Sequence, residues 1–163
     1  MEVLNTNECS SVLESLIQSA RKYVIIISPY IQISPRVESL LHIADQEGVA
    51  IFLIARDRLK KEEYAKVKGL EKLTICIHPP LHAKVYLNEN EVLLTSLNLY
   101  EFSQQNNTEI GMVFSRKEDK DSYMKVVDEF LNIMKDKRSA VPVDKLDDMD
   151  AKRFEKALNG SWF

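Results

Sequence analysis

The stretch YVIIISPY, residues 23–30, decides the fold class, because it is a run of mostly β-branched apolar residues that a proline interrupts. A run without polar alternation predicts a strand that is buried on both faces, and such strands are typical of parallel sheets between helices. Two further runs of this kind follow, VAIFLIA at residues 49–55 and the shorter LTICIH at residues 73–78.

The segments before and between these strands predict helices. Residues 8–22 and 35–47 carry apolar side chains at helical spacing, and the second segment opens with Pro35, a residue favoured in the first turn of a helix. Residues 56–69 are highly charged and end in Gly69, which predicts a third helix. The alternation of helix and strand indicates an α/β fold with parallel strands.

The second half of the chain does not continue this alternation of helix and strand. Residues 82–88 and 91–98 are apolar stretches separated by one short polar turn, which predicts a β-hairpin. Residues 108–115 predict another strand, and residues 117–137 a long amphipathic helix. We therefore expect an α/β fold with a mixed, largely parallel β-sheet flanked by helices on both faces.

Length and composition bound the remaining possibilities. A chain of 163 residues with 45% apolar and 29% charged residues is ordinary for a globular protein. We expect one domain over residues 1–140, with residues 141–163 forming a linker and a C-terminal helix packed on the domain or on a dimer partner. No apolar run is long enough to cross a bilayer and the N-terminus does not resemble a secretory signal, so no stable membrane association and a cytoplasmic location are expected. The two cysteines, Cys9 and Cys76, predict no disulfide framework, and no zinc-binding pattern is present.

Four polar residues interrupt the apolar hairpin. His82 and Lys84 are two residues apart, and side chains at that spacing on a strand point to one face. Ser96 and Asn98 have the same spacing on the next strand. Each pair alone is more typical of a solvated strand end or a turn, but the four together, in order and at strand spacing, predict a functional site.

These residues also resemble a known family. The sequence HAK at residues 82–84, NE at 88–89 and TSLN at 95–98 is similar to the His-x-Lys…Asp…Gly-Ser-x-Asn signature of the phospholipase D superfamily. NNTEIGMVF at residues 106–114 resembles the strand that follows this signature in the bacterial nuclease branch, and the similarity covers residues 8–135. The chain departs from the pattern at two positions. Glu89 stands where the family has Asp, or Asn88 if the count runs back from Ser96, because the spacing is one residue short, and Thr95 replaces Gly.

The resemblance implies a phosphodiester hydrolase. His82 would be the nucleophile that forms a phosphohistidine, while Lys84, Ser96 and Asn98 would bind the phosphate oxygens. Glu109 would orient the histidine and favour its charged form. Because two lysines and several hydrogen-bond donors can neutralise the phosphate, neither a metal nor another cofactor is expected.

The chemistry requires a second imidazole, because one cannot attack phosphorus from one side and protonate the leaving oxygen on the other. His42 lies within an apolar helix pattern and His78 precedes two prolines, so both are expected to be structural. The simplest source of the second imidazole is the same residue of a second chain, which predicts a homodimer.

The substrate is the least defined part of the prediction. Arg56, Arg58 and Lys60 follow the second predicted strand, where they would suit the backbone of a nucleic acid, with DNA preferred over RNA. A solvated helix with interleaved glutamates is an equally good interpretation of that segment. A phospholipid hydrolase of the same superfamily and a nucleic-acid-binding module with a dormant site stay open as alternatives to a nuclease.

Overall fold

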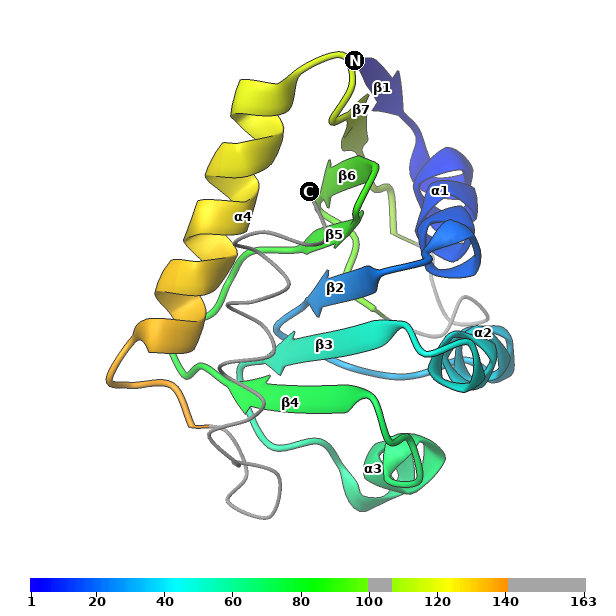
Figure 1. Ribbon diagram of the computed structural model, residues 1–163, viewed down its shortest axis with the longest axis vertical. Coiled ribbons are helices and arrows are strands. Elements are labelled where there is room, and N and C mark those ends of the chain that lie inside the picture. The colour runs from blue at the N-terminus through cyan, green and yellow to red at the C-terminus, as the bar shows by residue number, and fades with distance from the viewer. Residues whose placement is uncertain (100–106, 141–163) are drawn as a thin grey trace.

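The computed structural model describes residues 1–99 and 107–140, and its centre is a mixed sheet between two layers of helices (Figure 1). The order of the strands across this sheet is β1-β7-β6-β5-β2-β3-β4. The strands are β1 Glu2–Leu4, β2 Tyr23–Ile27, β3 Ala50–Ala55, β4 Leu73–Ile77, β5 Val85–Asn88, β6 Glu91–Thr95 and β7 Gly111–Ser115. The helices are α1 Thr6–Ser19, α2 Pro35–Gln46, α3 Lys61–Val67 and α4 Lys120–Lys135.

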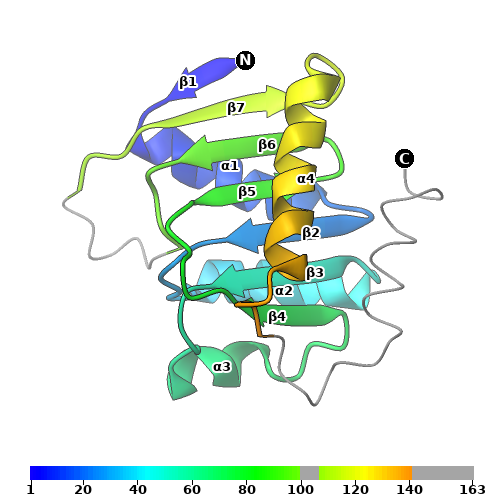
Figure 2. The same ribbon diagram turned by 90° about the vertical axis from the view of Figure 1, so that its left-hand side faces the viewer.

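The expected mixed α/β sheet with helices on both faces is confirmed. Helices α1, α2 and α3 lie on one side of the sheet in Figure 1, and α4 lies on the other side, where Figure 2 shows it crossing the strands. The parallel part is smaller than expected, because only the β2–β3 and β3–β4 pairs are parallel, whereas β2–β5, β5–β6, β6–β7 and β1–β7 are antiparallel. The reason is that β5 enters the sheet beside β2 in the opposite direction, and hairpin connections then continue that alternation.

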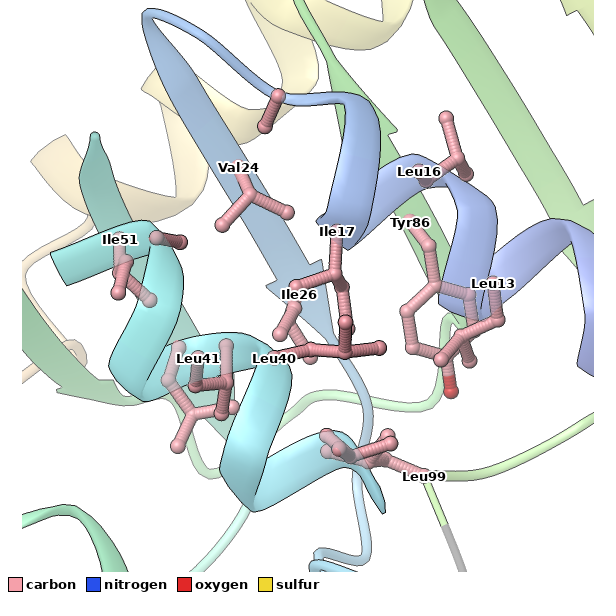
Figure 3. Packing of buried hydrophobic residues seen from close by; sticks show 14 of the residues in the cluster. Leu13, Leu16, Ile17, Val24, Ile26, Leu40, Leu41, Ile51, Tyr86 and Leu99 are labelled. Atoms are coloured by element: carbon pink, nitrogen blue, oxygen red, sulfur yellow. The ribbon is translucent and has the colours of Figure 1, made fainter. Parts of the chain in front are cut away.

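The apolar run of β2 serves two cores at once. Val24 and Ile26 pack with α1 and α2 on one face, while Tyr23, Ile25 and Ile27 pack under α4 on the other. Figure 3 shows the first core, in which side chains of α1 and α2 meet those of β2. All five residues of β2 are buried, which explains why its sequence shows no polar alternation.

Several expected element boundaries differ from the structure. The hairpin strand starts at Val85 rather than at residue 82, so His82 and Lys84 lie in the loop before β5. Strand β6 ends at Thr95, so Ser96 and Asn98 lie just after it. Residues 56–60 precede α3 instead of forming its first turns, and the short strand β1 was not predicted. The predicted C-terminal helix lies outside the described residues.

The ends of several strands that flank the motif residues lie at one edge of the sheet. Ile27, at the carboxyl end of β2, is paired with Val85, the first residue of β5. Thr95, at the end of β6, is paired with Gly111, the first residue of β7. This edge, called the catalytic-motif edge below, therefore carries the loop before β5, the segment after β6 and the segment before β7. Among the described helices, none is both long and apolar enough to span a membrane.

Candidate active site

The four motif residues lie on two neighbouring segments at the catalytic-motif edge, which the backbone of the β5–β6 hairpin joins. The amide of Thr95 donates to the carbonyl of Lys84 at 3.3 Å, which extends the antiparallel pairing one step beyond Val85 and Leu94. His82 and Lys84 therefore lie at this edge just before β5, and Ser96 and Asn98 lie there just after the neighbouring strand β6. The spacing argument from the sequence gives the right neighbourhood, although these residues flank the strands and are not within them.

Ser96 and Glu109 are in direct contact. The Ser96 hydroxyl donates to Oε2 of Glu109 and accepts from the amide of Ile110 at 3.1 Å. The amide of Ser96 donates in turn to the Ile110 carbonyl at 3.0 Å. Glu109 is also fixed from α1, because its amide donates to Oγ1 of Thr6 at 2.8 Å. A carboxylate is thus held at the edge beside the serine, 13 residues away in the sequence.

His82 is exposed, and Lys84 is half-buried. The Lys84 ammonium donates to the carbonyl of His82 at 3.1 Å, so the lysine folds back over its own loop. Within residues 1–99 and 107–140, the structure gives the His82 imidazole no hydrogen bond. Both ring nitrogens of His82 therefore remain available for a substrate or for a second chain.

Asn98 carries an unsatisfied acceptor. Its Oδ1 atom is buried and has no hydrogen-bond partner among the described residues. A buried carbonyl without a donor costs about 1–3 kcal/mol, so such atoms usually indicate a missing partner or a functional constraint. The Oδ1 atom of Asn98 is therefore available to a hydrogen-bond donor from outside the described residues.

Two buried hydroxyl groups hold the segment that carries Asn98. The Tyr86 hydroxyl donates to the carbonyl of Leu97 at 2.9 Å, and the amide of Leu99 donates to Oγ of Ser28 at 2.9 Å. Both hydroxyl-bearing residues are fully buried beneath this edge, and burial raises the pKa of Tyr86 above its ordinary value. They fix the backbone on either side of Asn98, a role that no pattern in the sequence indicated.

The other two histidines are held by internal contacts. The Nε2 atom of His42 is 2.9 Å from the carbonyl oxygen of Lys66, between α2 and α3. His78 is buried at the end of β4, where its Nδ1 atom lies 2.9 Å from Oγ of Ser139. Such contacts are what a structural role for both histidines requires. No group of three or more His, Cys, Asp or Glu side chains that could hold a metal ion occurs within the described residues.

The three basic residues after β3 have different surroundings. Arg56 is half-buried, and its Nε atom donates to the carbonyl of Leu81, the residue before His82, at 2.9 Å. Arg58 and Lys60 are exposed in the loop that leads to α3. Arg56 therefore braces the histidine loop, whereas the other two are free to meet a charged ligand.

The positions that depart from the family signature contribute to the scaffold. Glu89 is buried at the opposite edge of the sheet, where its carboxylate accepts from the amides of Arg21 at 2.9 Å and Lys22 at 3.3 Å. Asn88 is fully buried beside it, and its side-chain amide donates to the carbonyl of Leu16 at 2.9 Å. At the catalytic-motif edge, the Thr95 hydroxyl donates to the carbonyl of Ile110 at 2.9 Å, which adds a further tie between β6 and β7.

Comparison with known proteins identifies the family. The family model described as "Cardiolipin synthase, PLD-like domain" matches residues 13–134, which is most of the chain. The chain belongs to the phospholipase D superfamily. The family that the sequence resembles is thereby confirmed, and members of this superfamily act on phosphodiesters. No curated protein sequence gives a significant match.

Several solved structures share the fold of this chain. The phospholipase D family member Nuc from Salmonella typhimurium is 17% identical, with a TM-score of 0.63 over 86% of this chain and 95% of that chain. NucT from Helicobacter pylori is also 17% identical, with a TM-score of 0.62 over 82% of this chain and 96% of that chain. Phosphatidylserine synthase from Haemophilus influenzae Rd KW20 is 15% identical, with a TM-score of 0.67 over 96% of this chain and 45% of that chain. At these identities, the likeness establishes the fold alone.

Proposed function

We propose that this phospholipase D superfamily member is a metal-independent nuclease that acts through a phosphohistidine in a site shared by two identical chains. The observation that carries the proposal is that the segment of the exposed His82 and of Lys84 lies beside the segment of Ser96 and Asn98 at one sheet edge. DNA is the preferred substrate over RNA. A location in the reducing cytoplasm is part of this proposal, because Cys9 and Cys76 are buried thiols that are not joined in a disulfide.

In the first step, an imidazole nitrogen of His82 attacks phosphorus and the bond to the leaving oxygen breaks. A proton from the partner subunit's His82 goes to that oxygen, which leaves as an alcohol. In the second step, a water molecule attacks the phosphohistidine and gives its proton back to the partner's His82. The nitrogen–phosphorus bond breaks, and both imidazoles return to their starting states.

The remaining residues stabilise charge in this scheme. The Lys84 ammonium faces the non-bridging phosphate oxygens, together with the amide group of Asn98. Ser96 contributes its hydroxyl, and the contact between Ser96 and Glu109 fixes the direction in which that hydroxyl points. A lysine from each of two chains supplies two positive charges, which is the work that a divalent cation does in other phosphodiesterases.

Exposed apolar side chains support the association of two chains at this edge. Ile110, next to Glu109, is 63% exposed, and Val3 on the neighbouring strand β1 is 66% exposed. Strand alternation puts both on the α4 side of the sheet, because Leu4 belongs to the core under α1 and Phe114 to the core under α4. A second copy that covers these side chains would also bring its own His82 to the site.

A phospholipid hydrolase is the second candidate, and a specific observation favours it. The matching family model carries the description of a cardiolipin synthase domain, and a phosphatidylserine synthase has the same fold. The exposed Arg58 and Lys60, by contrast, favour a polyanionic backbone as the substrate. The comparison of substrates below separates the two candidates.

The test uses the purified full chain in excess chelator with single-stranded DNA, duplex DNA, RNA and phosphatidylglycerol vesicles. We expect turnover of nucleic acid, and a decrease of several orders of magnitude for His82→Ala, because the substitution removes the nucleophile. His42→Gln is the matched control, since it changes a histidine away from the edge but keeps a side-chain donor. Activity that requires added magnesium would contradict the metal-independent mechanism, and turnover of vesicles alone would favour the lipid enzyme.

The same assay tests the shared site. Wild-type chains are refolded together with a growing excess of His82→Ala chains, so that most wild-type chains enter mixed dimers. Activity per wild-type chain should then fall toward the level of the variant, because each site needs two imidazoles. Constant activity per wild-type chain would show that one chain is sufficient.

A further inference from the structure

An exposed aromatic side chain lies at the catalytic-motif edge, at a position that the proposed chemistry does not use. Tyr30 follows the carboxyl end of β2 by three residues and is 51% exposed. Its backbone is fixed, because Oγ of the buried Ser28 donates to the Tyr30 carbonyl at 2.8 Å. The next residue, Ile31, forms a parallel bridge with Leu99, directly after Asn98. The ring is therefore attached to the segment that carries Asn98.

Arg56 connects the same ring to the histidine loop. Its Nη1 atom donates to the Tyr30 hydroxyl at 3.1 Å, and the guanidinium carbon lies 5.3 Å from the centre of the Tyr30 ring. The Nε atom of the same side chain donates to the carbonyl of Leu81, adjacent to His82, at 2.9 Å. The amide of Arg56 also donates to the Pro29 carbonyl at 3.3 Å. One side chain thus orients Tyr30 relative to both halves of the site.

We propose that Tyr30, held by Arg56, is a stacking platform for a nucleotide base next to the scissile phosphate, and that it selects single-stranded nucleic acid. This inference rests on the proposed function and assigns a substrate class to it. Every base has a flat π face that can stack on an exposed aromatic ring, whatever the sequence. In a duplex both faces of each base are covered by its neighbours, so only an unpaired strand offers a free face to Tyr30.

The surroundings of Tyr30 suit this role better than that of an ordinary surface residue. A free surface tyrosine loses side-chain freedom when it binds, whereas Arg56 and the fixed backbone have already restricted this one. The guanidinium adds a positive charge beside the ring, at the place where the phosphate next to a stacked base would lie. The distances above place this pair between the segments of His82 and Asn98, so a stacked base and the reacting phosphate belong to neighbouring positions of one strand.

The experiment compares substrates that differ only in their bases. One is a labelled thymidine homopolymer, the second is an abasic tetrahydrofuran oligomer of equal length and charge, and the third is the thymidine strand annealed to its complement. Wild type should have a kcat/KM on the thymidine strand about 5- to 150-fold above that on the abasic oligomer, the range that corresponds to ~1–3 kcal/mol per stacked base. The duplex should be cleaved more slowly than the single strand.

Variants locate the effect. Tyr30→Ala should lose that same factor on the thymidine strand and change little on the abasic oligomer, whereas Tyr30→Phe, which keeps the ring, should retain most of it. Tyr64→Ala is the matched control, because Tyr64 is also exposed but lies in α3. This variant should cleave both substrates at the wild-type kcat/KM. Unfolding by urea verifies that the variants are folded.

The possible outcomes are distinct. Equal cleavage of the thymidine and abasic strands by wild type, or an equal loss on both with Tyr30→Ala, would overturn the stacking inference and leave the nuclease proposal standing. A wild-type enzyme that cleaves no nucleic acid would overturn both. If wild type hydrolyses phosphatidylglycerol and phosphatidylcholine vesicles but no nucleic acid, and Tyr30→Ala loses this activity, the ring would be assigned to a lipid substrate instead.

Discussion

Gly111 should not tolerate a methyl group, because β7 approaches α1 very closely at this point. A Cβ atom added to Gly111 would lie 2.5 Å from Sγ of Cys9, where ordinary contacts lie at 3.4–4 Å. It would also lie 3.2 Å from Cδ1 of Leu93 and from the carbonyl oxygen of Leu94. Cys9 is fully buried in α1, so Gly111→Ala requires the sulfur, α1 or β7 to shift within a packed core.

The expected cost follows from the density of the core. Overpacking by a single methylene or methyl group typically destabilises a protein by about 1–3 kcal/mol. In a domain of this size each kcal/mol lowers Tm by roughly 2–4 °C. Urea unfolding should therefore show a lower midpoint with an unchanged m value, and thermal unfolding a matching shift. The movement would also draw Glu109 and Ile110 away from Ser96, so turnover should fall along with stability.

A second substitution tests the cause. Cys9→Ala removes the sulfur that the new methyl group would meet, so the double variant should be more stable than the sum of the two single effects predicts. Gly69→Ala is the control, because nothing lies within 4 Å of a Cβ atom there, and its stability should be equal to wild type or slightly higher. If Gly111→Ala unfolds at the wild-type urea concentration, or if Cys9→Ala gives no rescue, the close approach of β7 to α1 is refuted.

Two further predictions concern the opposite edge of the sheet. Glu89→Ala removes the acceptor of two part-buried hydrogen bonds from the amides of Arg21 and Lys22, and should destabilise the fold by about 1–3 kcal/mol. Glu89→Gln, which keeps an oxygen, should cost less, and both variants should keep full activity per folded molecule. Loss of activity without loss of stability would contradict this scaffold role. Burial raises the pKa of Tyr23 to about 12, so the folded state keeps a proton that the unfolded chain releases near pH 10. The contribution of Tyr23 to stability should hence be constant below pH 10 and be lost between pH 10 and 12, by up to about 1.4 kcal/mol per pH unit. Urea titrations over this range should show a shallower fall for Tyr23→Phe than for wild type.

The parallel half of the fold could be predicted because its signals are local. The apolar runs at residues 23–27, 50–55 and 73–77 are each long enough to indicate a buried strand. The helical periodicity between them defines the crossovers, which almost always place such strands in one parallel sheet. The short polar turn between β5 and β6 likewise predicted their hairpin, which is confirmed by the pairing of Val85 with Leu94.

The antiparallel half depends on contacts that sequence periodicity does not contain. Nothing within residues 85–88 indicates that β5 inserts beside β2, a pairing that joins Val24 to Asn88. Strand β1 has three residues and becomes a strand only by pairing with β7, more than 100 residues later. Strand formation depends strongly on such tertiary context, so short strands and their ends are difficult to predict.

The site divides in a similar way. The residue types and their spacing pointed to His82, Lys84, Ser96 and Asn98, and the structure brings their segments to one edge; their catalytic roles stay predictions. The role of the Tyr86 hydroxyl, which binds the Leu97 carbonyl beneath this edge, could not be predicted from the sequence. An aromatic residue in an apolar strand predicts only a core position.

The unsatisfied Oδ1 of Asn98 has a consequence for how this protein would respond to selection. A buried acceptor without a donor lowers the free energy of unfolding, so apolar substitutions at this position should make the isolated chain more resistant to heat and denaturant. Laboratory evolution for thermal resistance alone should then replace Asn98 and give a more stable protein without the amide that the proposed phosphate site uses. An Asn98 that survives such selection only when activity is also required would show that this position trades stability for function.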